Sequence, residues 1–276
     1  AMAEWLASAK MSYACSTHLL DHVDGINLTS EQRQLLVSIP DPMFRETLRD
    51  FMVNQQFRRD YWVKGAERLP QAETNEMLGK MRFVMVQHRP DVSLKINGAL
   101  GEGTMNEGVY TPLLDLMADH KPRSLAQMEQ ALKSPAINAA QLKEAVIILA
   151  GNGTLALVQD DHVVTKARKG TSALNQYLTG RARGGGDFVY LASPVSGGGH
   201  MVGRFQQLFL QAIRDGRKQP ADWAQAVWET LQQQGQKIMK DGKPLSDDSD
   251  NIAELNAQAA TFAEKNLPVL KALQIA

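Results

Sequence analysis

Signals that start helices recur throughout this chain, and they constrain its fold more than any other feature. Thr29 and Ser124 each stand three residues before a glutamine, which is the spacing of a capping box at a helix N-terminus. Asp41 precedes Pro42, a second common start signal, and Asn138 precedes an apolar helical segment. The chain is therefore expected to contain many short helices.

Residues 1–103 combine helical and strand patterns. Apolar side chains recur at three- and four-residue steps over residues 3–23, which predicts a helix that ends before Gly25. A second helix starts at Pro42, and its expected apolar stripe comprises Phe44, Leu48, Phe51 and Met52. Strand formers are concentrated in residues 60–64, 82–88 and 92–97. We therefore expect a small mixed helix/sheet domain over residues 1–103.

Residues 104–166 predict a winged-helix-like module. Three short helices are expected over 110–119, 124–133 and 138–150, and "TLALV" and "HVVTK" then flank a turn as a β-hairpin would. Residues 167–276 predict a mainly helical C-terminal domain, interrupted by the glycine-rich segments "RARGGGD" and "SPVSGGGH", for which we expect loops. The fold class expected for the whole chain is α+β.

Charge and cysteine content exclude several classes of protein. The 276 residues include 30 Lys or Arg and 30 Asp or Glu, so the net charge gives no general attraction to nucleic acid or to an anionic membrane. Cys15 is the single cysteine, which rules out an intrachain disulfide and favours a cytoplasmic location. No apolar run approaches the roughly 18–20 residues that span a bilayer, and we expect neither membrane insertion nor a signal peptide.

A winged helix raises the alternative of a transcription regulator, but its charge opposes DNA binding. Residues 104–161 hold four Lys or Arg and seven Asp or Glu, a net charge of −3. The third helix, which would enter the major groove, offers only Lys143, and Glu144 follows it. Because affinity for DNA comes largely from neutralising phosphates, we expect no nucleic-acid partner.

Three other patterns suggest chemistry only weakly. Gly98, Gly101 and Gly103 have the spacing G-x-x-G-x-G, which is not a nucleotide-binding fingerprint, and we expect a linker there. On a helix, Cys15, His18 and His22 would share a face as half of a metal site, but no fourth ligand is evident, and we expect no metal. In "SPVSGGGH", Ser196 and His200 flank three glycines; a small enzyme built there would need a positioned partner for one of them, and a mobile loop is favoured.

Two surfaces combine basic with aromatic or polar residues and are candidate contact sites. The first lies in "RDFMVNQQFRRDYWVKG" and comprises Arg58, Arg59, Tyr61 and Trp62. Such a segment can face a partner, or its rings can be buried while its arginines pair with nearby carboxylates. The second follows from a basic segment at 166–186 and comprises Arg181, Arg183, His200 and Arg204.

Three segments carry a resemblance to a known family. "AKMSYACS", "DPMFRETLRDFMVNQQFRRDYWVKG" and "GVYTPLLDLMADH" resemble the regulatory region of bacterial S-adenosylmethionine-dependent methyltransferases. The resemblance is strongest over residues 9–116 and continues through "ASPVSGGGHMVGRFQQLFL" and "LPVLKAL". In that family a Rossmann-like catalytic domain precedes the regulatory and C-terminal domains, and some members methylate lysines of outer-membrane proteins.

The resemblance implies a non-catalytic role, because the acidic and glycine-rich loop of the family's catalytic domain has no match in this sequence. We therefore expect no catalytic residue and no cofactor site in the chain, with S-adenosylmethionine bound only by a catalytic domain that the chain lacks. The implied partners are that catalytic domain and a protein substrate, and a homodimer is compatible with the sequence.

Overall fold

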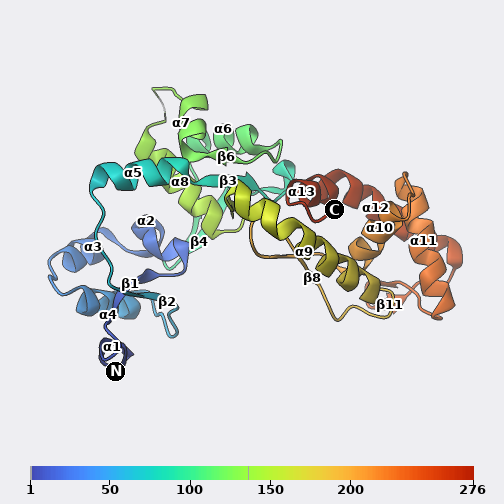
Figure 1. Ribbon diagram of the computed structural model, residues 1–276, viewed down its shortest axis with the longest axis horizontal. Helices are drawn as coiled ribbons and strands as arrows, with labels where there is room; N and C mark the ends of the chain where they lie inside the picture. The colour runs from blue at the N-terminus through green and yellow to red at the C-terminus, as the bar shows by residue number, and fades with distance from the viewer. Residues whose placement is uncertain (1, 136) are drawn as a thin grey trace. The chain divides into compact units, whose positions relative to one another are not determined.

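The computed structural model describes residues 2–135 and 137–276, which divide into two compact units (Figure 1). Unit 1 comprises residues 1–83, 89–119 and 123–156, and unit 2 comprises residues 84–88, 120–122 and 157–276. The helices and strands up to residue 158 are α1 (Met2–Ala7), β1 (Met11–Ser16), η1 (Leu19–His22), α2 (Asp24–Asn27), α3 (Ser30–Val37), α4 (Pro42–Met52), β2 (Asp60–Lys64), α5 (Gln71–Lys80), β3 (Arg82–Met85), η2 (Arg89–Asp91), β4 (Lys95–Gly98), β5 (Gly101–Thr104), α6 (Glu107–Met117), β6 (Arg123–Ser124), α7 (Leu125–Ala131), α8 (Ala139–Gly151) and β7 (Leu155–Val158). The mixture of helices and small sheets confirms the α+β class.

The first strand lies where a helix was predicted. Helix α1 ends at Ala7, Lys10 adopts a positive φ of 58°, and Met11–Ser16 then pair antiparallel with β2. Tyr13 lies opposite Trp62 in this two-stranded sheet. The predicted helix over residues 3–23 is therefore wrong, because pairing with a distant strand outweighs the local helical spacing.

The predicted helix starts are confirmed. The side chains of Thr29, Ser124 and Asn138 each accept a hydrogen bond from the backbone N–H three residues later, and a glutamine side chain completes each capping box. Asp41 accepts from the N–H groups of Met43 and Phe44 at 2.8 and 3.1 Å, and α4 begins at Pro42. These caps use donors that the first helical turn leaves without partners.

Helices α6, α7 and α8 form with the expected order, but the predicted hairpin after them is wrong. "HVVTK" belongs to the first turns of a long helix, α9 (Asp161–Arg181). The sheet instead has the order β6-β3-β7, so its central strand comes from residues upstream of all three helices. The winged-helix description and the domain boundaries at residues 103 and 166 stay predictions.

A β-hairpin occupies the glycine-rich segment that was expected to be a linker. Strands β4 and β5 pair antiparallel, with Gly98 opposite Gly101. Gly101 needs its positive φ of 106°, and a side chain on Gly98 would overlap the carbonyl oxygen of Ile26 in α2. Backbone conformation and close packing therefore account for these two glycines.

Unit 2 is mainly helical, as predicted. Its elements after β7 are α9, β8 (Tyr190–Ala192), β9 (Gly199–Met201), α10 (Arg204–Arg214), α11 (Pro220–Gln233), β10 (Met239–Lys240), β11 (Lys243–Pro244), α12 (Asp248–Thr261), the π-helical turn η3 (Phe262–Asn266) and α13 (Leu267–Ala272). The rings of Phe209, Trp223 and Phe262 meet in the core, with centroids 5.5 Å apart for Phe209–Phe262 and 6.1 Å apart for Trp223–Phe262. Helix α11 packs against both α10 and α12 (Figure 1).

The segment "SPVSGGGH" is a hairpin turn rather than a mobile loop. Strands β8 and β9 pair antiparallel on either side of it, with Leu191 opposite His200. The buried Ser193 hydroxyl donates to the carbonyl of Leu273 and accepts from the N–H groups of Val195 and Ser196.

Among the described residues, no helix is both long and apolar enough to cross a bilayer.

Candidate functional site

Helix α4 turns its polar face inward and its aromatic face outward. The side facing a cavity of about 720 Å³ in unit 1 carries Arg45, Glu46, Arg49 and Asp50. On the opposite side Phe44 and Phe51 are 54% and 79% exposed. A surface helix usually buries its apolar face, so this orientation is reversed.

Arg58 is held among three carboxylates. Its Nε donates to Asp60 at 2.7 Å, one terminal nitrogen donates to Asp50 at 2.9 Å, and the same nitrogen lies 3.7 Å from Glu46. The Arg58 side chain is only 15% exposed. This arrangement, which we call the Arg58 cluster, brings α4 together with the segment leading into β2.

The ring of Tyr13 completes the Arg58 cluster. The guanidinium carbon of Arg58 lies 5.2 Å from the ring centroid of Tyr13, within the range of a cation–π contact. Trp62 meets the edge of the same ring at 5.9 Å. Burial, followed by the nearby charge of Glu46, raises the pKa of Tyr13 above its usual range. Burial also raises the pKa of Asp50, against the opposing effect of Arg58.

A second set of polar contacts lies on the other wall of the cavity. Arg49 donates to the Asp24 carboxylate at 2.6 Å and to the backbone carbonyl of Asp21. The Asp21 carboxylate accepts from the Ser16 hydroxyl at 2.7 Å and lies 3.2 Å from His18 Nδ1. These bonds fix η1 and α2 against α4.

The predicted sharing of one helical face by Cys15, His18 and His22 is wrong. Cys15 lies in β1, His18 follows that strand, and His22 lies in η1. His22 Nε2 lies 3.0 Å from the backbone carbonyl of Ser16. In residues 2–135 and 137–276, no group of three or more His, Cys, Asp or Glu side chains is placed to hold a metal ion.

The residues predicted for the first surface divide into two environments. Arg58 is internal, and Trp62 is half-buried against Tyr13, as the interpretation with buried rings and paired arginines expected. Arg59 is exposed, and Tyr61 is 59% exposed on β2. The expectation that Phe51 and Phe57 pack inward is wrong, since Phe57 is 88% exposed.

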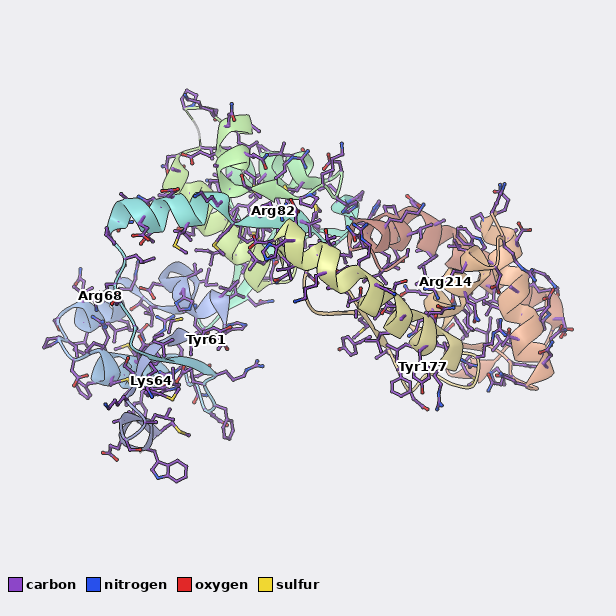
Figure 2. All side chains as sticks on the ribbon, viewed as in Figure 1. Tyr61, Lys64, Arg68, Arg82, Tyr177 and Arg214 are labelled. Carbon is purple, nitrogen blue, oxygen red and sulfur yellow. The ribbon has the colours of Figure 1, made fainter. Side chains whose placement is uncertain are left out.

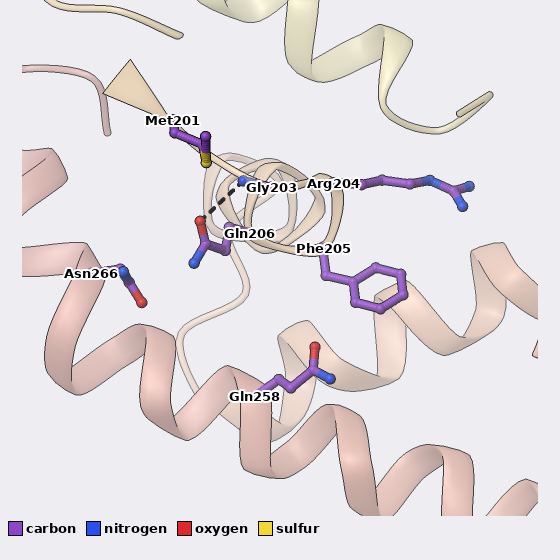
Figure 3. A pocket seen from close by; sticks show the side chains of 7 residues that line it. All are labelled: Met201, Gly203, Arg204, Phe205, Gln206, Gln258 and Asn266. Carbon is purple, nitrogen blue, oxygen red and sulfur yellow. Dashed lines mark hydrogen bonds between the residues drawn. The ribbon is translucent and has the colours of Figure 1, made fainter. Parts of the chain in front are cut away.

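Arg204, predicted for the second surface, ties three segments of unit 2 together. Its guanidinium donates to the backbone carbonyls of Ala182 and Arg183 and to the side chains of Gln234 and Gln236, at 2.8–3.1 Å. Beside it lies a pocket of about 480 Å³. Figure 3 shows the Arg204 side chain directed away from Gln206 and from the other amide side chains of this pocket.

The side chains of the other residues of the second surface do not make contacts with the Arg204 guanidinium. Arg181 is exposed at the end of α9, and Arg183 donates to Gln211 at 3.1 Å and lies 3.8 Å from Asp215. His200 lies in β9, where its Nε2 is 2.7 Å from the Ser196 hydroxyl. Burial lowers the pKa of His200, which favours the neutral imidazole. Ser196 therefore has the partner that the sequence did not name.

Sequence reasoning missed most of the Arg58 cluster and its cavity. Tyr13 lies within the segment that was predicted to be a helix, and the sequence indicated only unspecified nearby carboxylates as partners of the arginines. A signal was present, because Arg45, Glu46, Arg49 and Asp50 recur at helical spacing on one face of α4.

Comparison with known proteins finds a family model that matches the first part of the chain. Residues 1–64 match the model of a family described as "Predicted methyltransferase regulatory domain". This match covers α1 to β2 and so contains the Arg58 cluster.

A curated relative extends the similarity over nearly the whole chain. The Synechocystis sp. (strain ATCC 27184 / PCC 6803 / Kazusa) protein sll1526, itself described as uncharacterized, is 36% identical over 274 residues. The alignment covers 99% of this chain and 53% of that protein. The chain therefore spans about half the length of the relative that it matches.

Solved structures show the same fold. PKMT2 from Rickettsia typhi aligns with a TM-score of 0.57 and 13% identity, covering 100% of this chain and 57% of PKMT2. Its complex with AdoHcy aligns with a TM-score of 0.55 and 14% identity, covering 95% of this chain and 55% of PKMT2. At this identity the similarity concerns the fold.

Proposed function

We propose that this chain is the regulatory and substrate-recognition portion of an S-adenosylmethionine-dependent methyltransferase that acts on a protein. The match of residues 1–64 to a methyltransferase regulatory domain and the PKMT2-like fold support this proposal. In this role the chain carries no catalytic residue and binds no S-adenosylmethionine, because a separate catalytic domain supplies both.

The observation that carries the proposal is the exposed aromatic surface of the matched region. Four rings from α4, the following segment and β2 are exposed to solvent, and we call this group of exposed rings the aromatic face: Phe44, Phe51, Phe57 and Tyr61. Burying one large apolar side chain is worth about 1.5–3 kcal/mol, so leaving four exposed forgoes a substantial stabilisation. Aromatic side chains are enriched in the cores of protein interfaces, and we assign this face to contact with the catalytic domain.

The proposal gives the chain a positioning role. Binding energy from contacts remote from the reacting atoms can orient a substrate and raise the rate of a reaction that another domain performs. The exposed Arg59 and Lys64, which lie close to Phe57 and Tyr61 in the sequence, are suited to acidic positions of a protein substrate. Figure 2 labels Lys64 and Tyr61 on β2. A cytoplasmic location belongs to the same proposal.

The test combines the purified chain with the cognate catalytic domain. We expect the two to co-migrate in size-exclusion chromatography, and we expect calorimetric titration to detect S-adenosylmethionine binding by the mixture but not by the chain alone. Substituting both Phe51→Ser and Phe57→Ser should weaken the association at least about tenfold, since each ring is a candidate anchor. Tyr177→Ser is the matched control, because Tyr177 is an exposed ring on α9 of unit 2.

Two results would overturn this assignment. Binding of S-adenosylmethionine by the isolated chain would place a cofactor site in it and make it part of an enzyme's active site. Association that is unaffected by the double phenylalanine substitution would remove the aromatic face from the contact with the catalytic domain. Concentration-dependent dimerisation of the chain alone, lost in the same variant, would reassign the face to a homodimer.

A further inference from the structure

We propose that the cavity beside α4 binds a small anionic ligand through the guanidinium groups of Arg45 and Arg68. Both side chains line this cavity of about 720 Å³, Arg45 from α4 and Arg68 from the segment between β2 and α5. The proposal goes beyond the regulatory role assigned above, because it adds a ligand site within unit 1 that needs no second domain.

The acidic side chains that line the cavity already take part in hydrogen bonds or ion pairs. Asp24 accepts from Arg49, and Glu46 and Asp50 surround Arg58. Asp21 accepts from Ser16 and contacts His18. Each acidic side chain lining the cavity therefore has a cationic or hydroxyl partner already, so the cavity is poorly suited to an additional cation.

The four arginine side chains that line the cavity fall into two groups, one with carboxylate partners and one without. Arg49 and Arg58 are engaged with carboxylates, whereas the side chains of Arg45 and Arg68 make no hydrogen bond or ion pair with any described residue. Arg45 is half-buried on the inward face of α4. Arg68, labelled in Figure 2, is exposed. Two guanidinium groups with uncommitted hydrogen-bond donors thus line the cavity.

The chemistry of these two groups defines the class of ligand. A guanidinium keeps its charge at all relevant pH values and presents parallel N–H groups that match a carboxylate or a phosphate. The cavity volume falls in the range of about 300–1,000 Å³ that is common for small-molecule sites. Its lining is chiefly charged and polar, which fits a small carboxylate or phosphate rather than an apolar compound.

Calorimetric titration of the full chain with citrate and, separately, with inorganic phosphate tests the proposal and distinguishes the two anions. We expect one saturable site for at least one probe, with affinity that falls as salt concentration rises. Arg45→Gln and Arg68→Gln should each reduce that affinity at least about tenfold, because each removes a charge-assisted pair of hydrogen bonds.

Arg33→Gln is the matched control, because Arg33 is an exposed arginine of unit 1 that does not line the cavity. An equal loss in Arg33→Gln, an unchanged affinity in both cavity variants, or absence of saturable binding for both probes would overturn the proposal. Urea unfolding checks that each variant is folded, which is expected since neither cavity arginine makes a described side-chain hydrogen bond or ion pair. The measurement uses neither the catalytic domain nor S-adenosylmethionine, so its failure is distinguishable from failure of the proposed function.

Discussion

Replacing Arg58 by methionine tests whether the Arg58 cluster stabilises unit 1. The substitution retains an unbranched side chain of similar length but removes the charge that faces Asp60, Asp50 and Glu46. Three carboxylates would then lie together with no cation among them. We expect the folded state to be destabilised at neutral pH.

The expected loss in the free energy of unfolding depends on how far the side chains of the Arg58 cluster are buried. Removing one partner of a fully buried ion pair costs about 3–5 kcal/mol, because the remaining charge is left desolvated. The Arg58 side chain is 15% exposed, and the side chains of Asp60, Asp50 and Glu46 are 12%, 30% and 24% exposed, so water partly solvates the carboxylates that remain. We therefore expect a loss of about 3 kcal/mol in the free energy of unfolding, at the lower end of that range.

The pH dependence separates charge from packing. Burial already holds the pKa of Asp50 above its ordinary value of 3.8, while Arg58 opposes this shift. Without Arg58 that pKa rises further. A raised pKa in the folded state means that the carboxyl contributes stability below its unfolded pKa and loses that contribution as pH rises through the folded value. The deficit of Arg58→Met should therefore be largest near neutrality and shrink as pH falls towards about 4.

The assay is urea unfolding of the wild-type chain and of Arg58→Met, monitored by fluorescence at neutral pH and at about pH 4. Arg59→Met is the control, because Arg59 is an exposed neighbour without a described side-chain partner, and its effect should stay within about 0.5 kcal/mol. An equal deficit for Arg58→Met at both pH values would refute the electrostatic explanation. Equal stabilities of Arg58→Met and the wild type at neutral pH would refute the structural role of the cluster.

Three further substitutions test other parts of the structure. Gly98→Ala should destabilise unit 1 by about 1–3 kcal/mol in urea unfolding, because its new methyl group overlaps a backbone carbonyl of α2. A methyl group at Gly103 makes only ordinary contacts, so Gly103→Ala should lower the free energy of unfolding much less. Arg204→Ala should lower the free energy of unfolding by about 1–3 kcal/mol through loss of its hydrogen bonds, whereas the exposed Arg181→Ala should have little effect. Burial lowers the pKa of His200 in the folded state, so the unfolded state binds a proton on this imidazole more readily. The free energy of unfolding should therefore fall as pH drops through about 6.5. His200→Gln should lack this pH-dependent loss of stability when unfolding is measured at about pH 7.5 and pH 5.5.

Helix starts could be predicted from the sequence because their chemistry is local. Thr29, Ser124 and Asn138 bond to backbone groups three residues away, so the sequence around each cap contains both partners. The strand at Asp60–Lys64 was also predicted, from its β-forming side chains and the glycine that follows.

Errors arose where a distant segment decided the structure. The apolar spacing over residues 3–23 suits a helix, but Met11–Ser16 pair antiparallel with β2, with one irregularity in the register between Tyr13 and Cys15. Likewise "HVVTK" has β-branched residues typical of a strand, yet the sheet position beside β7 is filled by β3 from upstream, and the segment continues into α9. The hairpin at "SPVSGGGH" was missed because the pairing of Leu191 with His200 spans the glycines.

The sequence by itself determined the fold class, the helix starts and the two-faced character of α4. Only the tertiary structure decided which face of α4 points inward, because helical spacing places like residues on one side without stating what that side meets. In this protein the inward side is the charged one, where Arg58 from the approach to β2 offers a partner for Glu46 and Asp50. That choice leaves the rings of Phe44 and Phe51 exposed and encloses Arg45 in the cavity, and both functional proposals depend on it.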